Sequence, residues 1–200
     1  MYGVSTGTLR KAIDLLVAEG MLVRNQGRGT YIRRPRFDSS LFRFFRFKGR
    51  NGESVRPSAR VMHKATKIPD TAVKDALRLE DGTEALQLQR VRLVDQIPVL
   101  AEEIWLPLPR FASIAALQLD EFEDLLYPLY ERYSRQVVAS ATEVLRVEQA
   151  ESSIASTLNI SPGDPVIRVQ RTAFDFAGAP IEWRSTVGAA SGFEYQIEIR

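Results

Sequence analysis

Arg90 and Arg92 are the residues of this 200-residue chain that are best suited to bind an anion. They lie in the segment LQLQRVRLV, where alternation predicts a strand, and residues two apart on a strand share a face. Leu86 and Leu88 therefore share a face with the two arginines, which predicts an apolar face that runs into a polar cavity. Two guanidinium groups there need an anion, either on a ligand or on carboxylates of the protein.

Three further residues are candidates for the same pocket. Glu102 follows on the partner strand of the predicted hairpin, and Glu182 occupies a related place later in the chain. Each carboxylate either pairs with the arginines or accepts hydrogen bonds from the uncharged part of a ligand. Tyr127, in the segment DLLYPLYERY, either lines the pocket or only packs in the core.

Catalysis and metal binding find little support in the composition. There is no cysteine, and the one histidine, His63, stands beside Lys64 with no nucleophile nearby. We expect no catalytic residue, no metal and no cofactor. No apolar stretch reaches the length of a membrane span, and charged residues in the first twenty positions argue against a secretory signal, so we expect no membrane partner.

Charge divides the chain unevenly. Residues 1–60 contain 13 Lys and Arg against 4 Asp and Glu, whereas residues 61–200 contain 14 against 21, although the overall net charge is +2. A basic front end on an acidic body predicts a polyanionic partner for the front end only.

The basic front end reads as a helix followed by a hairpin. Apolar residues at helical spacing follow a capping Ser5 or Thr6, and the helix ends at Gly20. Two short strands, Met21–Arg24 and Thr30–Arg33, flank a turn at 25–29. The candidate DNA contacts are Ser5, Thr6, Thr8, Arg10 and Lys11 at the helix start and Arg28, Gly29 and Thr30 at the hairpin tip. The alternatives are a simple cap, a solvated helix face and a plain turn.

The rest of the chain contains an internal repeat. The segment beginning at Ala76 aligns with the one beginning at Thr157, which pairs Gly82 with Gly163 and Arg90 with Arg171. Two copies predict one antiparallel sheet built from two pseudo-symmetric lobes, with helices over 119–132 and near 148–158.

The segment VSTGTLRKAIDLLVAEGMLVRNQGRGTYIRRP closely resembles the recognition helix and wing of GntR-type bacterial transcription regulators. The resemblance implies an operator-DNA partner and two further helices before Met1, and we expect a truncation or a late start codon to account for their absence. We therefore expect operator binding in the full-length form. The resemblance also implies a bacterial cytoplasmic location.

The segment LQRVRLVDQIPVLAEEIWLP resembles the UTRA domain of the HutC branch of that family, with further matches at LYERY and APIEW. The resemblance implies an α+β fold like that of chorismate lyase, a six-stranded antiparallel sheet with flanking helices, preceded here by an incomplete winged helix. It also implies a homodimer and a small effector held by Arg90, Arg92, Glu102, Tyr127 and Glu182.

The pocket departs from its relatives at three places. Phe44, Phe45 and Arg46 replace a hydroxyl-rich segment, Leu125 replaces a frequent serine, and Gly188 a frequent tyrosine. We expect the first three to contact the effector, which is either a phosphorylated sugar or an organic carboxylate.

Three regions are expected: a truncated DNA-binding region at 1–33, a linker and first pocket segment at 34–57, and a UTRA domain at 58–200. The leading interpretation is an effector-controlled transcription regulator, most simply a repressor. The alternatives are an enzyme related to chorismate lyase, which the shared fold suggests, and a free-standing small-molecule binding module.

Overall fold

The computed structural model describes residues 3–18, 22–25, 27, 29–32, 47 and 55–193. The chain divides into two compact units, Met1–Pro35 and Arg36–Arg200. Each unit is described by itself.

The first unit contains one helix and one hairpin. Helix α1 spans Thr6–Ala18, and the hydroxyl of Ser5 accepts a hydrogen bond from the backbone N–H of Thr8 at 3.1 Å, as a capping residue does. Strands β1 (Leu22–Asn25) and β2 (Gly29–Ile32) pair in antiparallel register. The pairing of Asn25 with Gly29 leaves a tighter turn than the sequence predicted, and the φ of +100° at Gly29 suits glycine.

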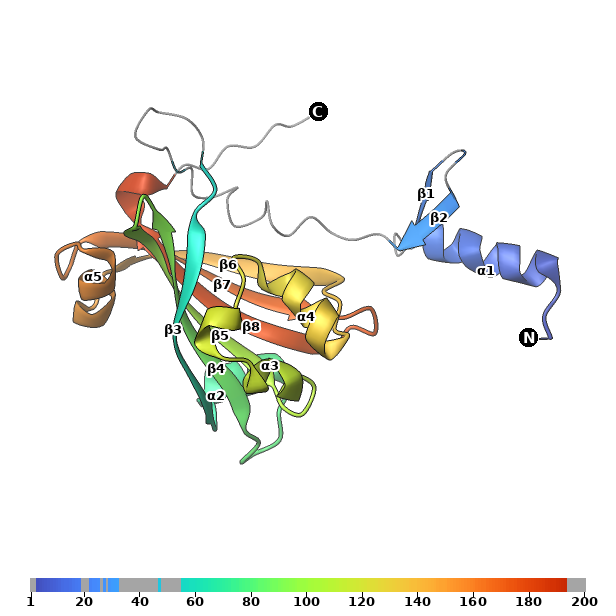
Figure 1. The fold of residues 1–200 in the computed structure, drawn as a ribbon, viewed down its shortest axis with the longest axis horizontal. Coiled ribbons are helices and arrows are strands. Elements are labelled where there is room, and N and C mark those ends of the chain that lie inside the picture. The colour runs from blue at the N-terminus through green and yellow to red at the C-terminus, as the bar shows by residue number, and fades with distance from the viewer. Residues whose placement is uncertain are drawn as a thin grey trace. The chain divides into compact units, whose positions relative to one another are not determined.

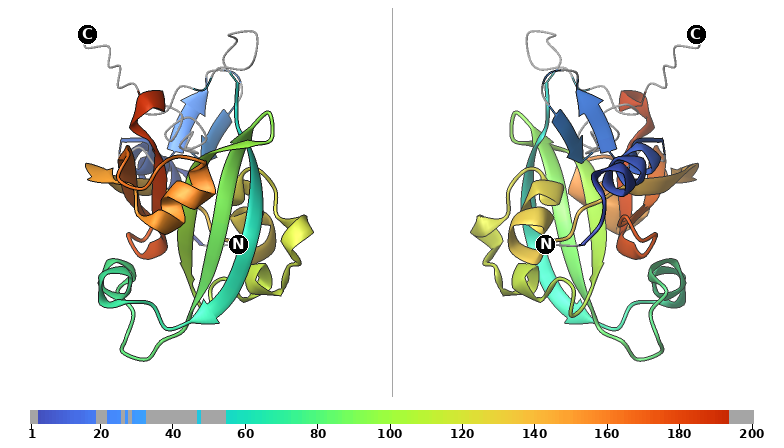
Figure 2. Two further views of the ribbon diagram at one scale, coloured as in Figure 1. Left: turned by 90° about the vertical axis from the view of Figure 1, so that its left-hand side faces the viewer. Right: turned by 90° about the vertical axis from the view of Figure 1, so that its right-hand side faces the viewer.

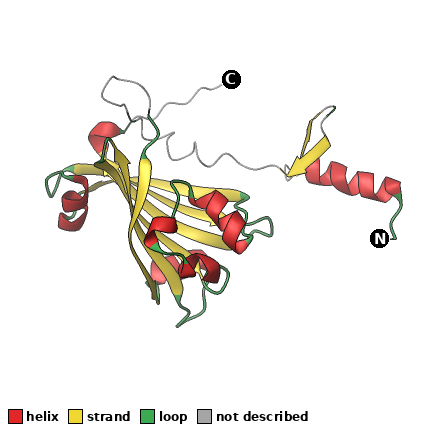
Figure 3. Ribbon diagram, in the orientation of Figure 1, coloured by secondary structure: helices red, strands yellow, loops and turns green. Residues whose placement is uncertain are grey.

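The second unit is built on a six-stranded antiparallel sheet in the order β3-β4-β5-β8-β7-β6 (Figures 1 and 3). This confirms the predicted fold class. The strands are β3 (Ser58–Lys67), β4 (Ala85–Val94), β5 (Ile97–Pro107), β6 (Ser140–Gln149), β7 (Pro165–Phe174) and β8 (Pro180–Ala189). The order leaves β3 and β6 at the two edges.

The internal repeat appears as two lobes with the same order of elements. In the first lobe α2 (Thr71–Leu77) joins β3 to β4, and in the second α5 (Ser152–Leu158) joins β6 to β7. Both helices end on a left-handed residue, Arg78 at φ 52° and Asn159 at φ 55°. The pseudo-symmetric lobes predicted from the repeat are present.

Helices cover both faces of the sheet (Figure 2). On one face, α3 (Ala112–Ala116), the 3-10 helix η3 (Leu119–Glu121) and α4 (Leu126–Ser134) enclose the largest apolar core. On the other face, α5 packs on Ala101 and Val187, and α2 on Trp105. We call these the α4 face and the α5 face. A short 3-10 helix, η4 (Ala190–Gly192), follows β8.

Two helix boundaries predicted from the sequence are wrong. The predicted helix over 119–132 is divided into η3 and α4, because Pro128 has no N–H and is tolerated only in the first turn of a helix. The predicted helix near 148–158 begins at Ser152 instead, because Glu148 and Gln149 belong to β6, where they pair with β7.

Candidate effector site

A row of charged side chains crosses the α4 face where the apolar core ends. Cross-strand register places Arg90 on β4 opposite Glu102 on β5, and Arg171 on β7 opposite Glu143 on β6. Arg184 on β8 lies opposite Arg171 and completes the row. We call the cluster formed by Arg90, Arg92, Glu102, Glu143, Arg171, Glu182 and Arg184 the charged network. As the sequence predicted, Leu86 and Leu88 precede the arginines of β4 on the same face, and both are buried.

Glu102 lies at the centre of three arginines. Its carboxylate accepts hydrogen bonds from Nε of Arg90 at 2.6 Å and from Nε of Arg92 at 3.3 Å. Nη1 of Arg184 lies 3.5 Å away on the third side. Burial alone would raise the pKa of Glu102, but the positive charges of the arginines hold it well below its usual range. Glu102 is therefore a buried carboxylate anion.

Glu182 is held by one arginine and two tyrosines. Nη2 of Arg184 lies 2.7 Å from one carboxylate oxygen, and the hydroxyl groups of Tyr127 and Tyr130 donate at 3.0 and 2.6 Å. Burial, followed by the nearby Glu182 carboxylate, raises the pKa of Tyr127 to about 12. Both tyrosines are accordingly neutral donors at physiological pH, and α4 is tied to the sheet through them.

Arg171 is the counterpart of Arg90 in the second lobe. Its Nε donates to Glu143 at 2.7 Å, and its Nη1 donates to the Tyr127 hydroxyl at 3.2 Å. By register Arg184, rather than Glu182, occupies the place equivalent to Glu102. The second lobe thus carries two arginines where the first has an arginine and a glutamate.

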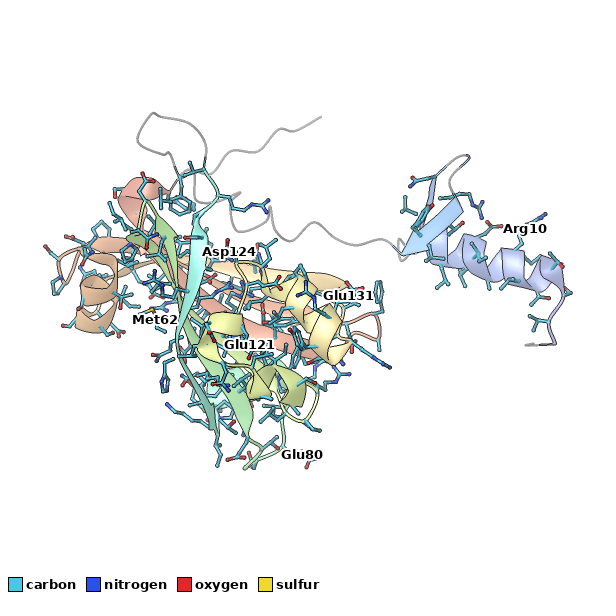
Figure 4. The ribbon with its side chains drawn as sticks, in the orientation of Figure 1. Arg10, Met62, Glu80, Glu121, Asp124 and Glu131 are labelled. Carbon is cyan, nitrogen blue, oxygen red and sulfur yellow. The ribbon has the colours of Figure 1, made fainter. Side chains whose placement is uncertain are left out.

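The segment between η3 and α4 covers the arginines of β4. A helical N–H at position 128 would bond to the carbonyl of Asp124, but Pro128 has no N–H. That carbonyl instead lies 3.5 Å from Nη1 of Arg90 and 3.5 Å from Nη1 of Arg92. The Asp124 carboxylate accepts a hydrogen bond from the backbone N–H of Ala59 on β3 at 2.6 Å (Figure 4). Asp124 therefore connects β3 to Arg90 and Arg92.

The charged network has an excess of positive charge. Its four arginines face three carboxylates, and two buried guanidinium atoms, Nη2 of Arg90 and Nε of Arg184, have no hydrogen-bond partner among the residues the structure describes. Burial lowers the pKa of Arg92 to about 10, against the attraction of Glu102. Buried donors without partners carry a desolvation penalty that an added anion would relieve.

The structure brings together most of the residues predicted to form the pocket. Arg90, Arg92, Glu102, Tyr127 and Glu182 all belong to or contact the charged network, whereas Phe44, Phe45 and Arg46 lie outside the described residues. Sequence reasoning missed Arg171, Arg184, Glu143 and Tyr130. The repeat alignment that paired Arg90 with Arg171 was a signal that could have identified the first of these.

The predicted DNA contacts lie on an exposed surface of the first unit. Thr6, Thr8, Arg10 and Lys11 are exposed on the first turns of α1, and Gly29 and Thr30 are exposed at the start of β2. Ser5 is exposed too, but its hydroxyl is engaged in capping, as one of the sequence alternatives held. An ion pair of 2.6 Å between Arg24 and Asp14 joins the hairpin to the helix. Arg28 lies outside the described residues.

The α+β body, its buried charged network and the separate basic helix–hairpin unit define a class of protein in which a ligand-binding domain accompanies a DNA-binding element. Residues 52–194 match the UTRA domain family, and residues 1–32 match the bacterial regulatory proteins of the gntR family. The chain belongs to the GntR family of transcription regulators that carry a UTRA domain.

Named relatives include repressors. The probable fructoselysine utilization operon transcriptional repressor of Shigella flexneri is 28% identical over 184 residues, which cover 90% of this chain and 73% of the relative. The HTH-type transcriptional repressor NagR of Bacillus subtilis is 28% identical over 189 residues, covering 93% and 76%. The chain is accordingly a DNA-binding transcription regulator and not an enzyme, which excludes the lyase alternative.

Solved structures agree on the fold. PhnF from Mycobacterium smegmatis matches with a TM-score of 0.66 at 19% identity, covering 100% of this chain and 87% of that one. A GntR-family regulator from Enterococcus faecalis matches with a TM-score of 0.62 at 25% identity, covering 71% and 100%. In the part of the chain that the structure describes, no helix is long and apolar enough to cross a membrane.

Proposed function

We propose that the charged network binds a small anionic effector and that this binding changes the affinity of the protein for its operator. The observation that carries the proposal is the excess of buried positive charge, four arginines against three carboxylates, together with the partnerless Nη2 of Arg90 and Nε of Arg184 among the described residues. An anion that reaches these atoms supplies the missing charge and the missing acceptors.

Arg90 and Arg92 hold the anionic group in this proposal. Both carboxylate oxygens of Glu102 already accept from these arginines, so Glu102 sets the positions of their guanidinium groups. Glu182 and Tyr127 lie further along the row, where they suit the uncharged part of the effector. The anion is a phosphorylated sugar or an organic carboxylate, and Phe44, Phe45 and Arg46 complete the pocket.

The effect of effector binding on operator affinity is transmitted through the start of β3. Ala59 on β3 lies opposite Arg92 in register and is bonded to Asp124, whose carbonyl contacts both arginines of the pair. An anion that displaces the Asp124 carbonyl therefore loosens the start of β3. This arrangement supports effector control of a repressor, and the two relatives named above are called transcriptional repressors.

Contact with DNA is assigned to α1 and the hairpin. Thr6, Thr8, Arg10 and Lys11 reach the base edges and phosphates, while Arg28, Gly29 and Thr30 bring the hairpin tip to the backbone. The exposure of the described members of this set and the basic charge of residues 1–60 support the assignment.

The protein acts as a homodimer whose contact lies in the body. Strand β6 is an edge of the sheet, and three of its apolar side chains are exposed: Val144, Leu145 and Val147, the last at 70%. A long edge strand with exposed apolar residues pairs readily with another strand unless it is covered. A second copy of the same strand, related by a two-fold axis, covers this edge. The resulting dimer presents two DNA-binding units to paired half-sites.

One experiment tests effector control directly. Fluorescence anisotropy of a labelled duplex, selected from a random-sequence library on the full-length protein, is followed while sugar phosphates and organic carboxylates are added. The proposal expects at least one anion to change the affinity for DNA in the wild type and to have no effect on Arg92→Ala. An anion response that persists in Arg92→Ala would contradict it.

A further inference from the structure

A cavity lies on the α5 face, on the opposite side of the sheet from the charged network. It has a volume of about 360 Å³ and lies between α5 and five strands of the sheet, β3, β4, β5, β7 and β8. Met62 forms its outer wall on β3, on the side of the strand toward α5 (Figure 4). Ligand pockets in proteins begin at about 300 Å³, so the cavity suits a molecule smaller than a typical drug.

Two oppositely charged residues of the sheet, Arg168 and Glu103, line this cavity, together with Glu151 at the start of α5. Arg168 on β7 is fixed by Glu148, 2.7 Å from its Nε, and by the Ser185 hydroxyl, 2.8 Å from its Nη1. Glu103 on β5 is fixed through one oxygen, which accepts from Trp105 Nε1 at 2.9 Å and from the side-chain amide of Gln87. Each charged group is therefore held in place by protein contacts before any ligand arrives.

Each group also has a free atom. Within the described chain, Nη2 of Arg168 and Oε2 of Glu103 have no hydrogen-bond partner. Ser185, which Arg168 reaches, is the direct cross-strand neighbour of Glu103. Arg168 on β7 and Glu103 on β5 thus lie on either side of β8, with Ser185 between them.

Apolar side chains continue the floor and the roof of the cavity beside these charges. Val91 and Val187 extend from the sheet, and Ile154 extends from α5. A cationic donor, an anionic acceptor on the same face and an adjoining apolar surface form the pattern that recognises a zwitterion with an aliphatic side chain.

We propose that this cavity binds a small aliphatic α-amino acid, whose carboxylate contacts Arg168 and whose ammonium group contacts Glu103. The site is distinct from the effector site, because alternate residues of β4 and β5 point to opposite faces. Arg90 and Glu102 belong to strands that line this cavity, but their side chains bond to each other and, from Arg90, to the Asp124 carbonyl on the α4 face. A ligand here and an anion on the α4 face can therefore bind together.

The test is isothermal titration of the full chain with L-alanine, L-valine and L-leucine. For L-leucine, two probes each lack one charge: 4-methylpentanoate has no amino group and 3-methylbutylamine has no carboxylate. We expect one-to-one binding of at least one amino acid and binding of each single-charge probe at least about tenfold weaker. Absence of heat with all three amino acids at millimolar concentration would overturn the proposal.

Variants locate the binding. Arg168→Gln and Glu103→Gln each lower the affinity about ten- to a hundredfold, while Arg132→Gln, which removes an exposed arginine of α4, leaves it unaltered. If Arg168→Gln and Glu103→Gln fail to fold, substitutions on α5 test the site instead. Ser153 is exposed and lines the cavity, so Ser153→Phe fills it, whereas Ser156→Phe on the same helix is the matched control. Equal binding by these two phenylalanine variants would exclude the cavity as the site.

A last variant separates this proposal from the proposed effector site. Arg92→Ala changes the α4 face only and leaves amino-acid binding at the wild-type level. Loss of amino-acid binding in Arg92→Ala would place the ligand in the charged network and overturn the second site.

Discussion

Nε of Arg90 lies 2.6 Å from Oε2 of Glu102, and the two side chains are 1% and 0% exposed. A buried ion pair costs desolvation energy, and a single pair of this kind often contributes no net stability. Here the same glutamate also holds Arg92 and lies near Arg184, so three positive charges depend on one carboxylate. The pair keeps two guanidinium groups in fixed positions beside each other, which is what anion binding requires.

Glu102→Gln removes the shared partner of three buried arginines. Leaving buried charge without compensation costs about 3–5 kcal/mol, and each kcal/mol lowers the Tm of a domain of this size by about 2–4 °C. We expect a Tm that is lower by about 6–20 °C in a thermal melt at pH 7. Glu123→Gln, which breaks the exposed pair with Arg132, is the control and leaves the Tm almost unchanged. Equal Tm values would show that the glutamate is not needed to hold the arginines.

The acid side of the stability profile depends on the same carboxylates. The positive charges of the surrounding arginines outweigh burial and lower the pKa of both Glu102 and Glu182. A depressed folded-state pKa contributes stability that is complete above the ordinary glutamate pKa, about 4.3, and is lost as the pH falls toward the folded value. We expect the Tm difference between the wild type and Glu102→Gln to shrink from pH 7 to pH 3. A constant difference would contradict the assignment of Glu102 as an anion.

The basic residues of α1 are expected to contact DNA phosphates or bases. Arg10→Ala and Lys11→Ala each remove an exposed positive charge from the helix. Each lost phosphate contact reduces the slope of log affinity against log salt by about 1. Anisotropy titrations of the full-length protein with a library-selected duplex, at several salt concentrations, measure this slope. Lys67→Ala, on an exposed end of β3 in the other unit, is the control and should leave the slope unaltered.

The β6 edge is expected to form the dimer contact. Val147→Lys places a charge on the most exposed apolar residue of that edge, which discourages strand pairing. Light scattering on the chain should report a dimer for the wild type and a monomer for the variant. Ile97→Lys, a charge added at a comparably exposed residue of the β4–β5 hairpin, should remain dimeric. A dimeric Val147→Lys variant would place the contact elsewhere.

The sheet was predictable from the sequence because the repeat doubles every signal. Gly82 and Gly163 mark equivalent turns, with φ of 78° and 88°, and the strands that follow each turn pair in equivalent registers. Helix boundaries were harder to predict. Pro128 prevents α4 from extending toward the N-terminus. Glu148 belongs to β6 because it pairs with β7, and a local sequence pattern does not reveal this pairing.

The site was predictable only in part. Period-two alternation predicted the shared face of Arg90 and Arg92, because it is a local property of one strand. The contribution of Arg184 depends on which strands are neighbours, since β5 meets β8 only when the two lobes join. Tertiary pairing of this kind has no local signal.

The most direct test of the account is the calorimetric titration of Arg92→Ala with sugar phosphates and organic carboxylates, accompanied by a melting curve. Removal of Arg92 leaves Glu102 bonded to Arg90 at 2.6 Å, so the fold is retained. A charge-assisted contact contributes roughly 1.5–3 kcal/mol, about ten- to a hundredfold in affinity. For an anion that the wild type binds, we predict that Arg92→Ala lowers the affinity by this factor. Arg110→Ala, which breaks an exposed ion pair, is the control and should leave the affinity unchanged. Unchanged anion affinity with a large fall in Tm would contradict the account and assign the arginines to structure alone.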